Sequence, residues 1–135
     1  MSQENVERLM KGYEAFAGGD IEPALALLDP DIEVEVHTER PDMERSLYRG
    51  YEGFLANIGE LTDVFDDFTI EPEAVDDRGD RIMVAVRASG RGKLSGAAIE
   101  VRLFHVWTVV NDLATRLEVY SEREQALAAL ETAAQ

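Results

Sequence analysis

The sequence predicts a single α+β domain, in which helices pack on one face of a largely antiparallel sheet. Apolar residues recur every three or four positions over 6–17, 21–28 and 54–65, the spacing of amphipathic helices. Over most of 68–120 they alternate with polar residues, as in strands. The 135 residues contain no internal repeat and no linker-like segment. We therefore expect one domain over residues 1–135, large enough to bury a core without disulfides or metal.

Four helices are expected. The first covers 6–17 and ends at a Gly-Gly pair, and the second covers 20–28, where an aspartate can cap its start. The sequence Asp-Pro-Asp at 29–31 is expected to stop the second helix. Residues 54–66 form the third helix, and 122–134 close the chain.

Strand spacing begins at Ile32, from which apolar and polar residues alternate to His37. Residues 38–50 are charged and aperiodic, which predicts a loop. The next strand covers 68–75 and contains Pro72, so it belongs at a sheet edge or carries a bulge.

The remaining strands are predicted to form hairpins. A strand over 81–89 is followed by the glycine-rich segment 90–96, which lacks the strand and helix context of a phosphate loop and is interpreted as a flexible or bulged connection. A long strand over 98–110 then turns at an Asn-Asp pair into a partner over 113–120.

The charge and composition exclude several functions. The net charge of −15 repels nucleic acid and acidic membrane surfaces at long range. The absence of cysteine removes thiol chemistry and thiolate metal sites, and the two histidines lack ligand-type spacing, so no metal site is expected. No apolar run approaches the roughly 20 residues of a membrane span, and the start lacks the pattern of a signal peptide. A cytoplasmic protein without nucleic-acid or membrane partners is the expectation.

Several short patterns follow one another along nearly the whole chain. They are Tyr13-Glu14-Ala15-Phe16 with Gly19-Asp20, then Ala26-Leu27-Leu28-Asp29-Pro30-Asp31-Ile32-Glu33, Tyr48-Arg49-Gly50-Tyr51-Glu52-Gly53-Phe54, His105-Val106-Trp107-Thr108, and Arg116-Leu117-Glu118-Val119-Tyr120. In order and spacing they resemble the SnoaL-like branch of the nuclear transport factor 2 superfamily. The resemblance implies a cone-like fold with a curved sheet, an internal pocket and dimerisation through the outer sheet face. The superfamily that it resembles includes ketosteroid isomerases, polyketide cyclases and epoxide hydrolases, so the fold does not determine the function.

The catalytic carboxylate positions of those enzymes fall on apolar residues here. By the resemblance, the base of ketosteroid isomerases falls near Val36 and their acid near Phe104, while their tyrosine falls on or beside Gly12, next to Tyr13. Arg102 matches the arginine of limonene epoxide hydrolases, but their aspartates fall near Phe104 and Val119. For a polyketide cyclase, His105 and Glu118 are the nearest candidates.

The face that each residue of the long strand presents decides whether it lines the pocket or the outer side of the sheet. Glu100, Arg102 and Phe104 alternate with Val101, Leu103, His105 and Trp107, and the resemblance assigns the first set to the pocket. On that assignment His105 and Trp107 lie in a homodimer interface on the outer sheet face. A bulge would reverse the assignment and give His105 a catalytic role.

The leading hypothesis is a domain that binds a small apolar ligand without a cofactor. Its expected ligand-binding residues are Arg102, Phe104, Val34, Val36, Tyr48, Phe54 and Val119. The alternative is a cofactor-free cyclase or isomerase that uses general acid-base catalysis by His105, Glu118 and Tyr13, and it requires at least two candidate groups to converge in one cavity. A third hypothesis is a dimerisation module with a vestigial pocket.

Overall fold

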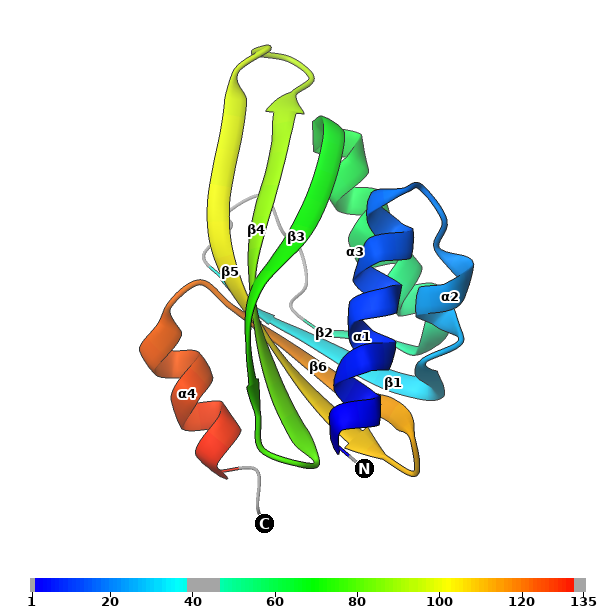
Figure 1. Ribbon diagram of the computed structural model, residues 1–135. Coiled ribbons are helices and arrows are strands. Elements are labelled where there is room, and N and C mark those ends of the chain that lie inside the picture. Colours follow the sequence, from blue (N-terminus) through cyan, green and yellow to red (C-terminus); the bar gives the residue numbers. More distant parts are fainter. Residues whose placement is uncertain (1, 39–46, 133–135) are drawn as a thin grey trace.

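The computed structural model describes residues 2–38 and 47–132. The chain forms a curved six-stranded sheet with helices on both sides (Figure 1). The strands lie in the order β2-β1-β6-β5-β4-β3, and every neighbouring pair is antiparallel except β1 and β6. The predicted α+β architecture is confirmed. None of the helices in the described ranges is both long and apolar enough to cross a membrane.

Within the described residues 2–38 and 47–64, three helices lie on one side of the sheet (Figure 1). Helix α1 spans Ser2–Ala17 and ends at the predicted Gly-Gly pair, where Gly19 has a positive φ of 88°. Helix α2 is a single turn at Glu22–Leu25, much shorter than expected. Helix α3 spans Gly50–Val64 and begins four residues before the predicted start.

Strand β1 spans Leu28–His37, so it begins where the second helix was expected to end. The Asp-Pro-Asp sequence does not stop the second helix, which already ends at Leu25. It lies within β1, where the pairing with β6 shifts register between Leu28 and Glu33. The loop expected over 38–50 contains the short strand β2, Leu47–Arg49, and residues 39–46 lie outside the described part of the chain.

The second half is a run of long antiparallel strands. Strand β3 spans Phe65–Asp77 at the sheet edge and bulges between Pro72 and Ala74, as the proline predicted. Strand β4 spans Arg81–Gly92 and extends three residues beyond its predicted end, into the glycine-rich segment.

The hairpin between the next two strands agrees with its prediction. Strand β5 spans Ala98–Val110 and β6 spans Leu113–Tyr120. They are joined by Asn111 and Asp112, whose φ values of 52° and 68° match the left-handed conformation that a tight hairpin turn requires.

Two apolar clusters lie on opposite faces of the sheet. The larger joins α1 and α3 to residues of β1, β4, β5 and β6, among them Val34, Val84 and Trp107. The smaller lies beneath α4, Arg123–Thr132, and contains Phe104 and Val106. The central residues 104–107 of β5 are therefore buried on both faces of the sheet.

Candidate functional site

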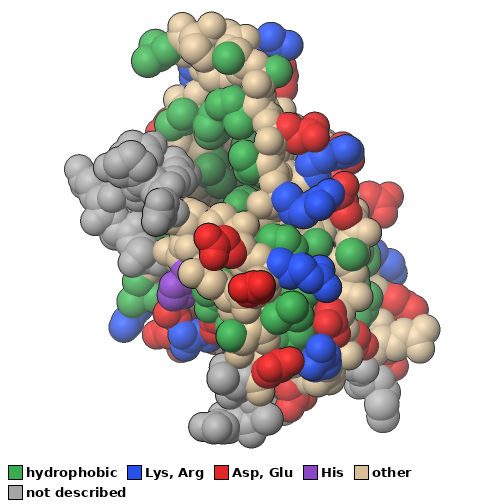
Figure 2. All heavy atoms as spheres, turned by 90° about the vertical axis from the view of Figure 1, so that its left-hand side faces the viewer, with side chains coloured by type: hydrophobic (Ala, Val, Ile, Leu, Met, Phe, Trp, Pro, Cys, Tyr) green, Lys and Arg blue, Asp and Glu red, His purple; other side chains and the backbone are tan. Residues whose placement is uncertain are grey.

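A cavity of about 660 Å³ lies between the helices and the concave face of the sheet. Figure 2 shows a hollow in the surface whose visible side chains are mostly hydrophobic. The lining residues come from both halves of the chain and are largely apolar; they include Leu9, Phe16, Leu27, Phe54, Ile58, Leu61, Phe68, Ile70, Val101 and Leu103. Such a cavity has the size and character of sites for small molecules.

Three polar side chains meet inside this apolar lining. The hydroxyl of Tyr13 lies 2.6 Å from Nδ1 of His105, and the indole Nε1 of Trp107 donates a hydrogen bond of 2.9 Å to the same hydroxyl. The Tyr13 and His105 rings stack with centroids 5.8 Å apart, and Trp107 meets Tyr13 edge to face at 6.3 Å. All three residues are buried and line the cavity.

Secondary structure explains this convergence. His105 and Trp107 are two positions apart on β5, so their side chains leave the same face of the sheet. Tyr13 lies on the apolar stripe of α1, which packs over that face. In the sheet His105 is paired with Val84 on β4 and Val119 on β6, so its neighbours on that face are apolar.

Burial keeps both titratable groups of the cluster uncharged at neutral pH. It lowers the pKa of His105 to about 4, because the imidazolium would lose its hydration in the apolar interior. It also raises the pKa of Tyr13 well above its usual range, an effect that the hydrogen bond from Trp107 partly offsets. The tautomer of a neutral imidazole decides whether Nδ1 accepts from Tyr13 or donates to it. In either case Nε2 remains for the cavity.

The structure corrects the predicted faces of β5. His105 and Trp107 point into the cavity, whereas Phe104 points to the other side of the sheet and packs beneath α4 with Ala126 and Leu130. Trp107 is 6% exposed and bonded to Tyr13, so it does not lie on an outer-face dimer interface. The wrong assignment came from the resemblance, and the burial of residues 104–107 on both faces of β5 left no alternation there to correct it.

Four of the expected ligand-binding residues, Val36, Phe54, Arg102 and Val119, line the cavity. Val34 and Tyr48 are buried in the adjoining core and are not on the lining; the Tyr48 hydroxyl donates to the Glu60 carboxylate.

Arg102 is at the rim of the cavity. Its guanidinium turns away from the interior and pairs with Glu73, with Nε 3.1 Å from a carboxylate oxygen. Its side chain is 64% exposed. The guanidinium is therefore engaged in an ion pair at the surface and does not reach the polar cluster.

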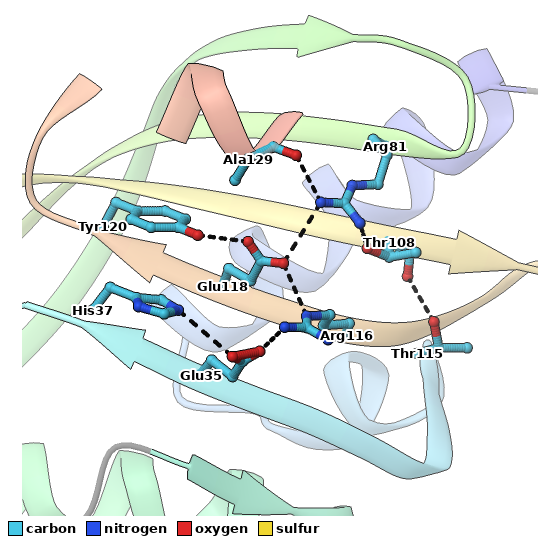
Figure 3. Close-up of polar contacts among 9 residues, drawn as sticks. All are labelled: Glu35, His37, Arg81, Thr108, Thr115, Arg116, Glu118, Tyr120 and Ala129. Carbon is cyan, nitrogen blue, oxygen red and sulfur yellow. Dashed lines mark hydrogen bonds and ion pairs between the residues drawn. The ribbon is translucent and has the colours of Figure 1, made fainter. Parts of the chain in front are cut away.

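Glu118, the second expected catalytic residue, lies on the opposite face of the sheet. Its carboxylate is buried between two arginines, with Oε1 3.5 Å from Arg81 Nη2 and 2.9 Å from Arg116 Nε, and it accepts a hydrogen bond of 2.7 Å from Tyr120 (Figure 3). Burial, together with the bond to Glu118, raises the pKa of Tyr120. Glu118 and His105 therefore cannot act on one substrate, although their strands are neighbours.

The same network connects α4 to the sheet. Arg81 donates to the Thr108 hydroxyl and to the backbone carbonyl of Ala129 on α4, each at 2.8 Å (Figure 3). Arg116 also pairs with Glu35 on β1. This arrangement has a structural role, because it compensates the buried carboxylate and holds α4 against its apolar cluster.

The sequence did not identify Trp107 as a polar group of the cavity. The available signal was the pair of polar-headed rings at 105 and 107 within an otherwise apolar stretch of strand. Such residues need buried hydrogen-bond partners on the same face, and Tyr13 supplies one for both.

Comparisons with known proteins agree with this architecture. The family model described as "SnoaL-like domain" matches residues 9–117. No curated protein matches the sequence.

Solved structures resemble the chain over most of its length. TerC, crystallised with polyporic acid, is 23% identical with a TM-score of 0.77, and the match covers 96% of this chain and 98% of that one. A nuclear transport factor 2-like protein from Burkholderia xenovorans LB400 is 26% identical, with a TM-score of 0.72 and coverages of 96% and 97%. A protein from Jannaschia sp. CCS1 that is named after SnoaL-like polyketide cyclases is 16% identical, with a TM-score of 0.75 and coverages of 96% and 92%. With the family model matching most of its length, the chain belongs to the SnoaL-like domain family and has the nuclear transport factor 2-like fold.

Proposed function

We propose that this domain binds a small, uncharged and largely apolar molecule, one oxygen of which bonds to the Tyr13–His105 pair. The observation that carries the proposal is the convergence of Tyr13, His105 and Trp107 inside an apolar cavity of about 660 Å³. A few polar groups in an apolar lining orient a ligand, while the lining supplies the affinity.

The charges around the cavity favour a neutral ligand. Tyr13 and His105 are both uncharged at neutral pH, and among the described residues of the lining the one arginine, Arg102, turns outward to Glu73. The net charge of −15 repels anions at longer range. A carboxylate or phosphate bound at the Tyr13–His105 pair would therefore have no cationic partner in that pair. TerC, crystallised with polyporic acid, supports the use of this fold for holding a small molecule.

Calorimetric titration of the purified chain with 4-propylphenol tests the proposal. We expect saturable binding to the wild-type chain and an at least tenfold weaker affinity for Tyr13→Phe, because the ligand hydroxyl loses its partner. Tyr51→Phe is the matched control: its hydroxyl donates to the Leu28 carbonyl on the outside of the cavity and should leave the affinity unchanged. Equal affinities of Tyr13→Phe and the wild-type chain, or no binding by the wild-type chain, would refute the proposal.

A second candidate function is general acid-base catalysis on such a ligand, as in a cofactor-free cyclase or isomerase. It is favoured by one observation, the 2.6 Å contact between a neutral imidazole and a phenol in the cavity, since two candidate groups converge there. Tyr13 would donate to a ligand carbonyl, and His105 would take a proton from the adjacent carbon. Glu118 has no part in this, because it lies on the other face of the sheet.

Isotope exchange distinguishes catalysis from binding. With 2-tetralone in heavy water, a catalytic cavity would accelerate exchange of the protons next to the carbonyl, measured by NMR, and His105→Asn would abolish the acceleration. Tyr51→Phe, which changes a residue outside the cavity lining, is the control. If the protons of 2-tetralone exchanged at the same rate as in buffer alone, catalysis would be refuted and ligand binding would stay as the proposed function.

A further inference from the structure

The cavity continues beyond the polar cluster as a groove along β4. On this face of β4 the residues become smaller toward the end of the strand, from Val86 in the core to Ala88 and Gly90 on the cavity lining. Ala88 is paired with Ile70 on β3 and with Val101 on β5, so these two larger side chains stand on either side of it. Small residues between larger ones give the sheet a groove with an apolar floor.

An aromatic pair closes the far end of the groove. Phe65 and Phe68 stack with ring centroids 6.3 Å apart, and both line the cavity. Gly90 permits this arrangement, because a Cβ there would lie 3.1 Å from Phe65 Cβ and 3.5 Å from Phe68 Cα. The bulge between Asp66 and Thr69, with a φ of 54° at Asp67, brings β3 over the glycine.

One wall of the groove is open to solvent. Ile99 and Val101 belong to the lining, yet they are 38% and 47% exposed. Ile99 lies six positions before His105 on β5, which is about 20 Å along a strand. A molecule the size of a single ring at Tyr13 would leave this apolar wall uncovered.

We infer that the ligand is elongated, with its oxygen at the Tyr13–His105 pair and an apolar chain or ring system that extends along the Ala88–Gly90 floor and covers Ile99 and Val101. This inference rests on the proposed function and adds the shape of the ligand to it. The groove then sets the ligand length, and the Phe65–Phe68 pair sets its limit.

A series of 4-alkylphenols from propyl to heptyl tests the inference by calorimetry. All share the head group, so only the length of the tail changes. We expect affinity to rise about fourfold per methylene as the tail enters the groove. A rise that stops at propyl would overturn the inference and leave the proposed function intact, whereas absence of binding by every member would refute both.

Substitutions in the exposed wall of the groove test whether the alkyl tail of the ligand lies there. In Ile99→Asn/Val101→Asn, 4-heptylphenol should bind at least tenfold more weakly while 4-propylphenol binds as before. Val110→Asn is the matched control, because Val110 is 51% exposed on the same strand and does not line the cavity. Unchanged heptylphenol affinity in the double variant would overturn the inference.

A second variant fills the groove from its floor. Ala88 is 4% exposed, and Ala88→Leu places a larger side chain between Ile70 and Val101. It should lower the affinity for heptylphenol and preserve that for propylphenol, with circular dichroism confirming the fold. Equal losses for both phenols would show that the tail does not occupy the groove.

Discussion

The hydroxyl of Tyr13 and Nδ1 of His105 lie 2.6 Å apart in the apolar interior, although 92 positions separate them in the sequence. The contact connects α1 to the centre of the sheet, and Trp107 donates to the same hydroxyl. One hydroxyl therefore satisfies two buried ring nitrogens of β5. This arrangement makes Tyr13 important for stability as well as for the proposed ligand.

Removing the hydroxyl should destabilise the domain. In Tyr13→Phe, His105 Nδ1 and Trp107 Nε1 lose their partner at buried positions, and an unsatisfied buried polar group costs about 1–3 kcal/mol. We expect a decrease of this size in the free energy of unfolding, measured in urea. Tyr51→Phe loses one bond at a partly exposed site and should change stability by less than about 1 kcal/mol. Equal effects of the two substitutions would contradict the assigned bonds.

The burial of His105 makes stability depend on pH. As pH falls through about 6.5 the imidazole of the unfolded chain takes up a proton, whereas the folded chain resists until about pH 4. The unfolded state therefore binds more protons in this window, and the free energy of unfolding should fall by about 3 kcal/mol across it.

The comparison with His105→Asn isolates this contribution from that of the carboxylates. Asparagine cannot be protonated, so the stability difference between the wild-type chain and the variant should shrink as pH falls from 6.5 to 4. Val110→Asn, an exposed position on β5 without a titratable group, is the control and should leave the difference constant. Parallel curves for wild type and His105→Asn would show that His105 is not the group responsible.

Much of the fold was predictable because local patterns determine it. The bounds of β5 and the Asn111–Asp112 turn follow from a long apolar stretch and from residues that tolerate positive φ. The predicted start of β1 at Ile32 was wrong. Residues 24–28 carry the apolar spacing of a helix, but in the structure Leu28 is buried in the core and paired with Ala114 of β6. Tertiary pairing outweighed local preference there.

The site was less predictable, for a related reason. Alternation assigns a strand face only where one face is polar, but Phe104 and Val106 are buried beneath α4 while Trp107 is buried beneath α1. The sequence identified Tyr13 and His105 as candidates without showing that they meet. Glu118 was misplaced for the same reason, since position 118 is buried on one face and 119 on the other.

The carboxylate of Glu118 should matter for stability but not for binding. Glu118→Gln leaves Arg81 and Arg116 without their shared buried partner, and breaking a buried pair typically costs about 3–5 kcal/mol. Glu71→Gln removes an exposed pair with Arg87 and should have no measurable effect on unfolding. The affinity for 4-propylphenol should be unchanged in folded Glu118→Gln. Weaker binding of 4-propylphenol by folded Glu118→Gln would mean that Glu118 contributes to the ligand site.

The uncharged cluster should discriminate against anions. At pH 7, 4-propylphenol is neutral and 4-propylbenzoate is an anion of similar size, and neither Tyr13 nor His105 carries a positive charge that could compensate a buried carboxylate. We expect the phenol to bind at least tenfold more tightly, measured by calorimetry and by the shift of the indole N–H resonance of Trp107, the single tryptophan of the chain.

Lowering the pH toward 4 should reduce this difference in affinity for two reasons. The benzoate begins to take up a proton and becomes neutral, and His105 begins to take up a proton, which places a cation beside the ligand. In His105→Asn only the first effect remains, so the narrowing should be smaller. Tighter binding of the benzoate at pH 7 would mean that a cation reaches the cavity and that the proposed ligand class is wrong.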